Sequence, residues 1–348
     1  MRRVLIVAVA VISVVFLLNI GLAVYNNVQQ STTSLLHVPH LSNTYQFVRL
    51  AKALDVDVGR HRGKTVDWIT QGFRPDGTVV VDCGLNSADA EDTLGDIYYA
   101  ILTLKELGEY PPDGPAIVRH VLSLEQAHGA FTQAPGIDEA YWAGKNFPRA
   151  AIENMTLHNT YRALTVLNYL RARPAHADAT RQYLLQYWPA LQLQSADLTG
   201  SKRMDSQDIL SLVRSLQLLD VEVERLPDYA VVVEEVNSRI VGVAQQQPLD
   251  ASSILEGHTL MELSQALSLP LPDFATSFVP QLLAHQHDDG GFDLGLGPYS
   301  ESLGTRMAVE IIVGSGQSVP ERDKLDALIQ QHMSPKGGFS LMSHHREP

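Results

Sequence analysis

Cysteine is almost absent from this sequence of 348 residues, which contains only Cys83. A single thiol excludes an internal disulfide and any zinc site built from several cysteines. Positive charge is also scarce, because 26 lysines and arginines are set against 39 aspartates and glutamates, a net charge of −13. A chain of this charge repels phosphate backbones, so the composition excludes nucleic acid as a partner.

Charge is missing altogether from Val4 to Tyr25, a run that follows two arginines at the N-terminus. About 20 apolar residues are needed to cross a bilayer as a helix. Because the arginines precede the run, the remainder of the chain should be exported. We expect residues 1–26 to form a single-pass signal-anchor at the cell membrane with a cytoplasmic N-terminus, and residues 27–40 to form a linker. A cleaved signal peptide is the alternative, but the run does not end in a small-x-small cleavage site.

Long runs of alternating apolar and polar residues are missing too, so we expect an all-α fold rather than a sheet. Apolar residues recur instead at helical spacing, in two alternating families of segments. The first family is apolar on most sides, as in helices packed on both faces, and comprises residues 43–54, 93–107, 158–170, 208–219, 258–269 and 304–313. The second family is more amphipathic and comprises residues 64–71, 115–126, 180–193, 228–246, 273–287 and 322–332.

A turn of the form Gly-Gly-Phe joins the second kind of segment to the first, most clearly at Phe292 and Phe339. The last unit ends in this turn without a following helix, and the first helix of the chain has the sequence to complete it. Repeated helical units must stack or close on themselves to bury their apolar faces. We therefore predict a closed (α/α)6 toroid, a double ring of six inner and six outer helices over residues 41–343, with residues 344–348 as a tail. An open superhelix is the alternative.

Three segments carry a resemblance to a known family: Gln286 through Phe292 with Thr305, Gln331 through Phe339, and Asn159-Thr160-Tyr161-Arg162-Ala163-Leu164. They resemble the prenyltransferase and squalene-cyclase repeat, Gln-x-x-x-Gly-Gly-Phe followed by a Thr-Tyr-x-Ala-Leu helix. The resemblance implies a toroid around a central apolar cavity and, for the enzymes of the family, isoprenoid substrates. The repeat is specific for fold and unspecific for reaction.

The catalytic motifs of that family are missing. The Asp-x-Asp-Asp string of its class II cyclases does not occur, and Asp82 directly precedes Cys83 where the prenyltransferases have a zinc-binding Asp-x-Cys. The thioester motif Cys-Gly-Glu-Gln of complement-like members is only partly matched by Cys83-Gly84-Leu85-Asn86. Enzyme status is therefore open.

The densest set of acidic residues is Asp89, Asp92 and Asp96, whose offsets place the three carboxylates on one helical face. Crowded carboxylates can hold a divalent cation or keep one carboxyl protonated as a general acid. These three residues are our candidate catalytic site, with a divalent cation as its candidate cofactor. Helix capping is the competing interpretation.

Other candidates lie where the inner helices are expected to begin, since their N-termini should gather at one mouth that favours anions. The long insertion after Phe131 mixes aromatic and charged residues, as loops that carry specificity do. The candidate ligand-binding residues are Tyr141, Trp142, Arg149, His158, Arg203, His258 and Arg306.

Three functions are compatible with these features. The first is a membrane-anchored, extracytoplasmic enzyme that acts on an isoprenoid or other lipid in the central cavity. The second is a non-catalytic toroid that binds a lipid, peptide or protein partner at the cell surface. The third is a carbohydrate-active (α/α)6 enzyme, which needs two placed carboxylates and aromatic platforms. The sequence has only three tryptophans for such platforms.

Overall fold

A computed structural model of the chain describes residues 39–81, 93–188, 204–246, 249, 251–270, 274–292 and 302–340. These residues form helices joined by turns, without a β-strand among them, and pairing of the strand type is limited to isolated bridges. The predicted anchor and linker up to residue 38, and the predicted tail, lie outside the described residues. The all-α prediction is confirmed.

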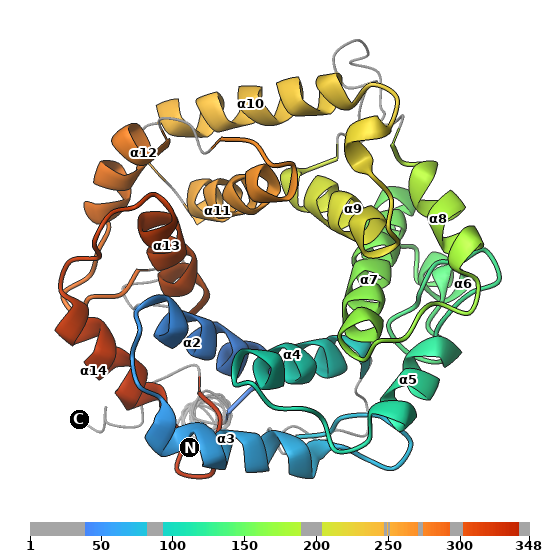
Figure 1. Ribbon diagram of the computed structural model, residues 1–348, viewed down its shortest axis with the longest axis horizontal. Helices are drawn as coiled ribbons and strands as arrows, with labels where there is room; N and C mark the ends of the chain where they lie inside the picture. Colours follow the sequence, from blue (N-terminus) through green and yellow to red (C-terminus); the bar gives the residue numbers. More distant parts are fainter. Residues whose placement is uncertain are drawn as a thin grey trace, which may run out of the picture.

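The helices of the described ranges form two concentric rings (Figure 1). The inner ring comprises α2 (Leu41–Ala53), α4 (Thr93–Glu106), α7 (Arg149–Tyr169), α9 (Ser206–Leu218), α11 (Ala251–Ala266) and α13 (Ser302–Gly314). The outer ring comprises α3 (Gly59–Gly72), α5 (Gly114–Ser123), α8 (Ala177–Leu185), α10 (Tyr229–Gln245), α12 (Phe274–Leu283) and α14 (Arg322–His332). Each predicted segment corresponds to one of these helices, and the two families of segments are the two rings.

Two short elements lie outside this alternation: α6 (Glu139–Gly144), and a 3₁₀ turn at Val223–Arg225. The inner helices α7 and α11 begin nine and seven residues earlier than predicted, at Arg149 and Ala251 rather than at His158 and His258. The sequence placed their starts too late because their first turns carry polar residues such as Glu153 and Glu256. These residues interrupt the apolar periodicity without interrupting the helix.

The two ends of the ring meet as the sequence predicts. The bridge between Pro39 and Ser340 joins the chain before α2 to the chain after α14, and the backbone N–H of His40 donates to the carbonyl of Phe339 at 3.2 Å. The ring of Phe339 stacks on Phe47 of α2 with centroids 5.1 Å apart. Because α2 also packs along α13, no inner helix at this seam has an open face.

A recurrent hydrogen bond fixes the turn onto the next inner helix. The backbone N–H of Phe339 donates to the hydroxyl of Thr44 at 2.9 Å, that of Phe292 to Thr305 at 3.0 Å, and that of Phe131 to Thr160 at 3.1 Å. Each of these phenylalanines is at most 1% exposed. The threonine therefore gives a partner to a buried N–H that would otherwise be unsatisfied, which explains why Thr recurs near the start of inner helices.

The glycine of the same turn allows close contact with the next outer helix. Gly129 has φ +90°, and a Cβ built on it would lie 2.1 Å from the backbone nitrogen of Thr180 on α8. At the seam, Gly337 has φ +105°, and its Cβ would lie 2.3 Å from the carbonyl oxygen of Lys64 on α3. Only glycine combines this backbone conformation with this approach. The last turn thus contacts the first outer helix in the way that earlier turns contact the next one.

Candidate functional site

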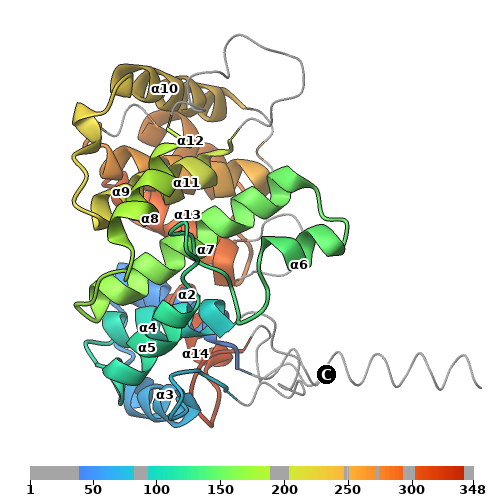
Figure 2. The same ribbon diagram turned by 90° about the vertical axis from the view of Figure 1, so that its right-hand side faces the viewer.

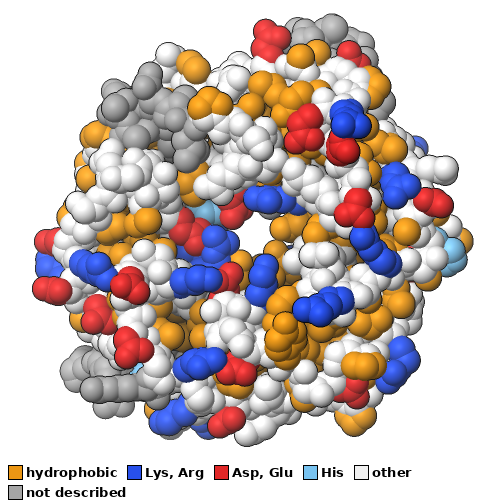
Figure 3. All heavy atoms as spheres, in the orientation of Figure 1, with side chains coloured by type: hydrophobic (Ala, Val, Ile, Leu, Met, Phe, Trp, Pro, Cys, Tyr) orange, Lys and Arg blue, Asp and Glu red, His pale blue; other side chains and the backbone are white. Residues whose placement is uncertain are grey.

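The ring surrounds a central hollow, which is visible when the molecule is viewed along its shortest axis (Figure 3). Lysine and arginine side chains gather around its opening, with acidic side chains and a histidine beside them (Figure 3). The side chains that line the hollow come from the inner helices, and they divide into an ionic half and a tyrosine half.

The ionic half lies where α11, α13 and α2 meet. Arg49 contacts Glu310 at 2.8 Å and Glu262 at 3.5 Å. Glu310 also accepts a hydrogen bond from Nε2 of His258 at 2.7 Å and forms an ion pair with Arg306, one helical turn before it. His258 and Arg306 are both buried. The sequence pointed to these two as ligand-binding residues, but their contacts show that they hold Glu310.

Glu310 is held in its ionised form. Burial opposes ionisation, but the hydrogen bond with His258 and then the charges of Arg306 and Arg49 outweigh it, and the pKa of this carboxyl lies below its usual value. A carboxyl of this kind accepts hydrogen bonds and does not deliver a proton at neutral pH. Glu310 therefore does not replace the proton donor of the cyclases that the sequence resembles.

The tyrosine half consists of side chains from α2, α4 and α7. Tyr99 lies 5.9 Å from Tyr45 and 5.3 Å from Tyr98, and Tyr98 lies 6.3 Å from Tyr161, measured between ring centroids. Burial raises the pKa of Tyr45 to about 12, although Arg49 donates to its hydroxyl at 3.1 Å and lowers it. Burial also raises the pKa of Tyr98. The hydroxyls of Tyr45 and Tyr98 are therefore neutral at physiological pH, and the wall of tyrosines is aromatic with polar tips.

The two halves share one space. Burial raises the pKa of Tyr161 on α7, Glu262 on α11 raises it further, and Arg214 on α9 lowers it. These three helices follow one another around the inner ring, and their side chains interact within the hollow (Figure 1). Tyr161 is thus the residue where the tyrosine wall meets the charged side chains.

Two further arginines belong to this hollow, and the sequence analysis missed both. The guanidinium of Arg162 lies 6.0 Å from the ring centroid of Tyr98. Arg214 is half-buried, and within the described ranges it has no ion-pair or hydrogen-bond partner.

His158, another predicted ligand residue, is held between α7 and α9. Its Nδ1 lies 2.9 Å from the hydroxyl of Ser211 and its Nε2 lies 3.2 Å from Asp208. Ser, His and Asp are the residue types of a nucleophilic triad, but Ser211 is completely buried and no substrate reaches it. Asp208 also accepts from Asn154 at 2.8 Å. This cluster links two inner helices, much as His258 links α11 to α13.

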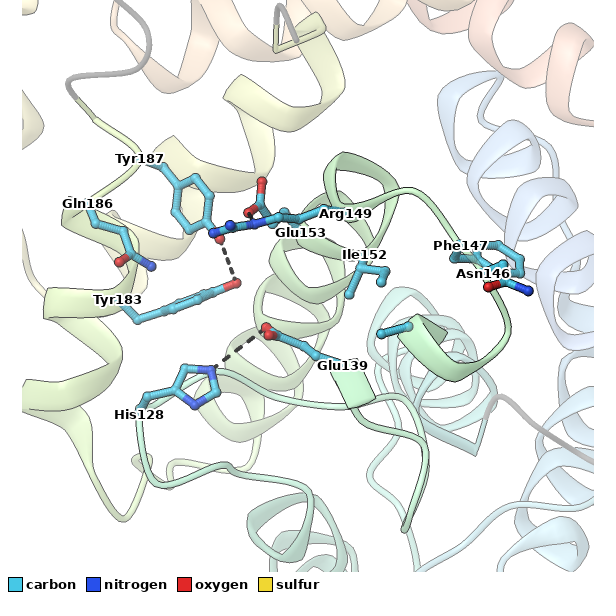
Figure 4. Close-up of a pocket in the computed structure, with 11 residues that line it drawn as sticks. His128, Glu139, Asn146, Phe147, Arg149, Ile152, Glu153, Tyr183, Gln186 and Tyr187 are labelled. Carbon is cyan, nitrogen blue, oxygen red and sulfur yellow. Dashed lines mark hydrogen bonds and ion pairs between the residues drawn. The ribbon is translucent and has the colours of Figure 1, made fainter. Parts of the chain in front are cut away.

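A second pocket, of about 810 Å³, lies outside the hollow between α6, the start of α7 and α8 (Figure 4). Its lining combines aromatic, carboxylate, amide and basic side chains: His128, Glu139, Ala143, Asn146, Phe147, Arg149, Ile152, Glu153, Tyr183, Gln186 and Tyr187.

The charged side chains of this pocket form pairs of one basic and one acidic residue, and its two tyrosines contact each other. Arg149 contacts Glu153 at 2.7 Å, and His128 lies 3.9 Å from Glu139. The hydroxyl of Tyr187 donates to that of Tyr183 at 3.2 Å. Burial, followed by its contact with Tyr187, raises the pKa of Tyr183 strongly. The pocket therefore offers neutral hydroxyls and aromatic rings to a ligand.

The predicted residues of the insertion do come together. Tyr141 and Trp142 lie on α6 with ring centroids 5.1 Å apart, and Trp142 lies 4.8 Å from Phe147. Arg149 is the first residue of α7 and lines the pocket beside this aromatic cluster. That these residues bind a ligand stays a prediction.

The aspartate stripe is only partly within the described residues. Asp96 lies in the first turn of α4, which begins at Thr93 as predicted, and its charge suits the helix dipole. Asp89, Asp92 and the candidate ligand residue Arg203 lie outside the described residues. Among the residues that are described, no group of three or more His, Cys, Asp or Glu side chains is arranged to hold a metal ion. The catalytic stripe and its cation stay predictions.

Within the described ranges, no helix combines the length and the apolar character needed to cross a bilayer. The predicted signal-anchor at residues 1–26 lies outside these ranges.

Comparison with known proteins agrees with the geometry. The sequence model of the prenyltransferase alpha-alpha toroid domain matches the chain three times, over residues 19–147, 96–252 and 232–348. No curated protein matches the chain. The matches overlap along the chain, as expected when one repeated unit builds a ring. With its two rings of helices, its Phe-to-Thr turns and these matches over most of its length, the chain belongs to the prenyltransferase alpha-alpha toroid domain family.

Proposed function

We propose that this protein is an exported, membrane-anchored toroid that binds an anionic, amphipathic lipid in its central hollow without initiating a cyclisation. The observation that carries the proposal is the division of the hollow into guanidinium groups and tyrosine rings. An anionic head group fits the first half, and an apolar or unsaturated chain fits the second.

Charge supports the anionic part of the proposal. The hollow contains the guanidinium groups of Arg49, Arg162, Arg214 and Arg306, whereas the protein as a whole has a net charge of −13. Glu310 and Glu262 neutralise Arg49 and Arg306 in part. A local excess of positive charge in a concave, low-dielectric site concentrates anions there. Arg214 is the guanidinium best placed to meet the ligand, since no described residue pairs with it.

The ionised state of Glu310, the buried carboxylate of the ionic half, supports binding over cyclisation. The sequence has no Asp-x-Asp-Asp string, and Glu310 is kept ionised by His258, Arg306 and Arg49. An alkene is protonated only by a carboxyl that keeps its proton at the working pH. Catalysis at Asp89, Asp92 and Asp96 stays a separate prediction, which an Asp92→Asn, Asp96→Asn double variant tests through product formation.

Membrane anchoring and an extracytoplasmic location are part of the proposal, supported by the uncharged run from Val4 to Tyr25 and the arginines before it. Protease added to intact cells should remove the domain, and alkaline extraction of membranes should leave the full chain in the pellet. Complete protection from the protease would contradict the exported orientation.

The binding test uses farnesyl phosphate and farnesol, which share a chain and differ in charge. The purified full chain in detergent should bind farnesyl phosphate more tightly. Arg214→Gln should weaken that binding about tenfold, which corresponds to about 1.4 kcal/mol, and should leave farnesol binding unchanged. Arg173→Gln is the matched control, because Arg173 pairs with Asp220 on the exposed surface. Equal affinity for the two probes would contradict an anion site, and conversion of either probe to a product would favour an enzyme.

The carbohydrate-active alternative finds two carboxylates, Glu139 and Glu153, beside tyrosines in the pocket of Figure 4. Its general acid would have to be protonated. Glu153 forms an ion pair with Arg149, and Glu139 lies on the exposed rim beside His128, so neither carboxylate stands apart from a basic side chain. The geometry therefore favours the central hollow as the functional site.

A further inference from the structure

The inner helix α7 is longer than the inner helices beside the seam, and its extra length lies at its N-terminal end. Thr160, Thr44 and Thr305 accept the same hydrogen bond from a turn phenylalanine, so they mark equivalent positions. Thr160 is preceded by eleven residues of α7, whereas Thr44 and Thr305 are each preceded by three residues of their helices. The eight additional residues extend α7 by about 12 Å at a rise of 1.5 Å per residue.

Helix α6 packs against this extension and carries two partly exposed aromatic side chains, Tyr141 and Trp142. Figure 2 shows α6 and the start of α7 projecting from one side of the ring. No residue of α6 is buried, and Phe147 after it is 44% exposed. Tyr141 and Trp142 contact each other, and Trp142 also contacts Phe147. We call Tyr141, Trp142 and Phe147 the aromatic finger.

The acidic side chains next to the finger, Asp138 and Glu139, each have a partner. Asp138 caps α6 by accepting from the backbone N–H of Tyr141 at 2.9 Å, and Glu139 lies toward His128 in the pocket (Figure 4). Lys145 lies 5.5 Å from the ring centroid of Tyr141, and Arg149 is 92% exposed. The finger thus presents aromatic rings beside Lys145 and beside Arg149, whose guanidinium is paired with Glu153.

The finger stands at the mouth where the predicted linker enters the ring. The described chain enters α2 through Pro39 and His40, and residues 145–148 join α6 to the extension of α7. Consecutive inner helices run in the same direction, because each pair is joined through an outer helix that returns the chain (Figure 1). The starts of α2 and α7 therefore face the same side. A chain of twelve residues, the length of 27–38, spans at most about 40 Å when extended, which exceeds the extension of α7 of about 12 Å.

We propose that the aromatic finger inserts into the interfacial region of the bilayer that anchors the chain, so that the mouth of the central hollow faces the lipid. Tryptophan and tyrosine favour this region because their rings are amphipathic, and lysine and arginine beside them suit lipid phosphates. This inference rests on the proposed membrane anchor. It adds a fixed orientation of the ring, which gives a lipid a short path into the hollow.

Quenching of tryptophan fluorescence by brominated lipid tests the proposal on the full chain. The chain has three tryptophans, of which Trp188 is buried and Trp68 packs against the turn at Gly338. The protein is reconstituted into vesicles of phosphatidylcholine or of its analogue brominated at a shallow position of the acyl chain. In the wild type, brominated lipid should remove most of the fluorescence that Trp142 emits. In Trp142→Phe, which lacks this emission, the fluorescence lost to brominated lipid should be smaller by that amount.

A reporter at the opposite mouth is the matched control. Tyr110 is 66% exposed and follows the C-terminal end of α4, away from the starts of the inner helices. In a Trp142→Phe, Tyr110→Trp variant, the new tryptophan should escape quenching. Equal quenching of the wild type and Trp142→Phe, or strong quenching at position 110, would overturn the proposed orientation.

Flotation of the same vesicles separates this inference from the proposed anchor. If the chain does not float with the vesicles, the anchor fails and the inference fails with it. If the chain floats but Trp142 is not quenched, the anchor holds and the finger faces something other than lipid, such as a partner protein, which overturns this inference alone.

Discussion

Two regions of the ring hold their inner helices in place with different hydrogen bonds. At the seam between α13 and α2, a backbone N–H in the turn donates to Thr44, and glycine lets the turn approach α3. Between α9 and α11, Thr259 instead donates to Gln207 at 3.3 Å and to the carbonyl of Leu255 at 2.9 Å. The equivalent threonine is still present there, but it has a different partner.

Longer polar side chains hold the second region together. Ser206 at the start of α9 donates to Glu256 of α11, and Arg239 of α10 donates to Ser206 at 3.0 Å and to the carbonyl of Met204 at 2.9 Å. The comparison shows that the toroid depends on joining neighbouring inner helices, and that the turn motif is one of two ways to do so. The turn requires glycine and threonine at fixed positions and is therefore recognisable in the sequence, whereas the side-chain network is not.

Replacing the glycine at the seam should have the largest effect. Gly337→Val places a Cβ 2.3 Å from the carbonyl of Lys64 at φ +105°, so the free energy of unfolding should fall by about 3 kcal/mol or more. Gly144→Ala on α6 is the control, because a Cβ there meets no atom within 4 Å. Urea unfolding measures both variants. Similar values for the two would show that the seam does not need its glycine.

Removing the shared carboxylate of the ionic half should have a comparable or somewhat smaller effect. Glu310→Gln leaves Arg306 and His258 buried without their partner, so we expect a loss of about 3 kcal/mol. Glu321→Gln breaks only an exposed pair with Lys324 and should cost less than about 1 kcal/mol. An equal and small effect of both substitutions would mean that the ionic half contributes little to the fold.

A matched pair of threonine substitutions sharpens the comparison between the two regions. Thr305→Val leaves the buried N–H of Phe292 without an acceptor and should cost about 1–3 kcal/mol. Thr259→Val removes only donated bonds, so no N–H is left unsatisfied and the cost should be smaller. Thermal unfolding of the two variants measures the difference. A larger loss at Thr259 would contradict the role that we assign to the turn.

The smallest expected effect is a change in pH dependence. The pKa of Glu310 in the folded state lies below its ordinary value of 4.5, so its contribution to stability is present above that pH and is lost as the pH falls toward the folded pKa. The difference in unfolding free energy between the wild type and Glu310→Gln should therefore shrink below about pH 4.5. Urea unfolding at pH 7 and at acidic pH tests this prediction. A difference in unfolding free energy that grows in acid would contradict it.

The sequence predicted the architecture much better than the site. Helical periodicity located each inner and outer helix, and the match between the last turn and the first helix predicted the seam at Thr44 and Phe339. His258 and Arg306 were chosen for their position at helix starts, but they stabilise Glu310, which the sequence did not single out. Arg214 was missed because its neighbours in the sequence give no sign of what lies across the ring.

By itself, the sequence determined the local features of this protein: the helices, their alternation, the turns and the closure of the ring. These depend on residues close together in the chain, or on the turn motif that recurs at Phe131, Phe292 and Phe339. Only the tertiary structure decided which side chains share the central hollow, since Tyr161, Arg214 and Glu262 come from three different helices. The charge of such a site follows from the rotation of each inner helix about its axis, which packing against both neighbours sets.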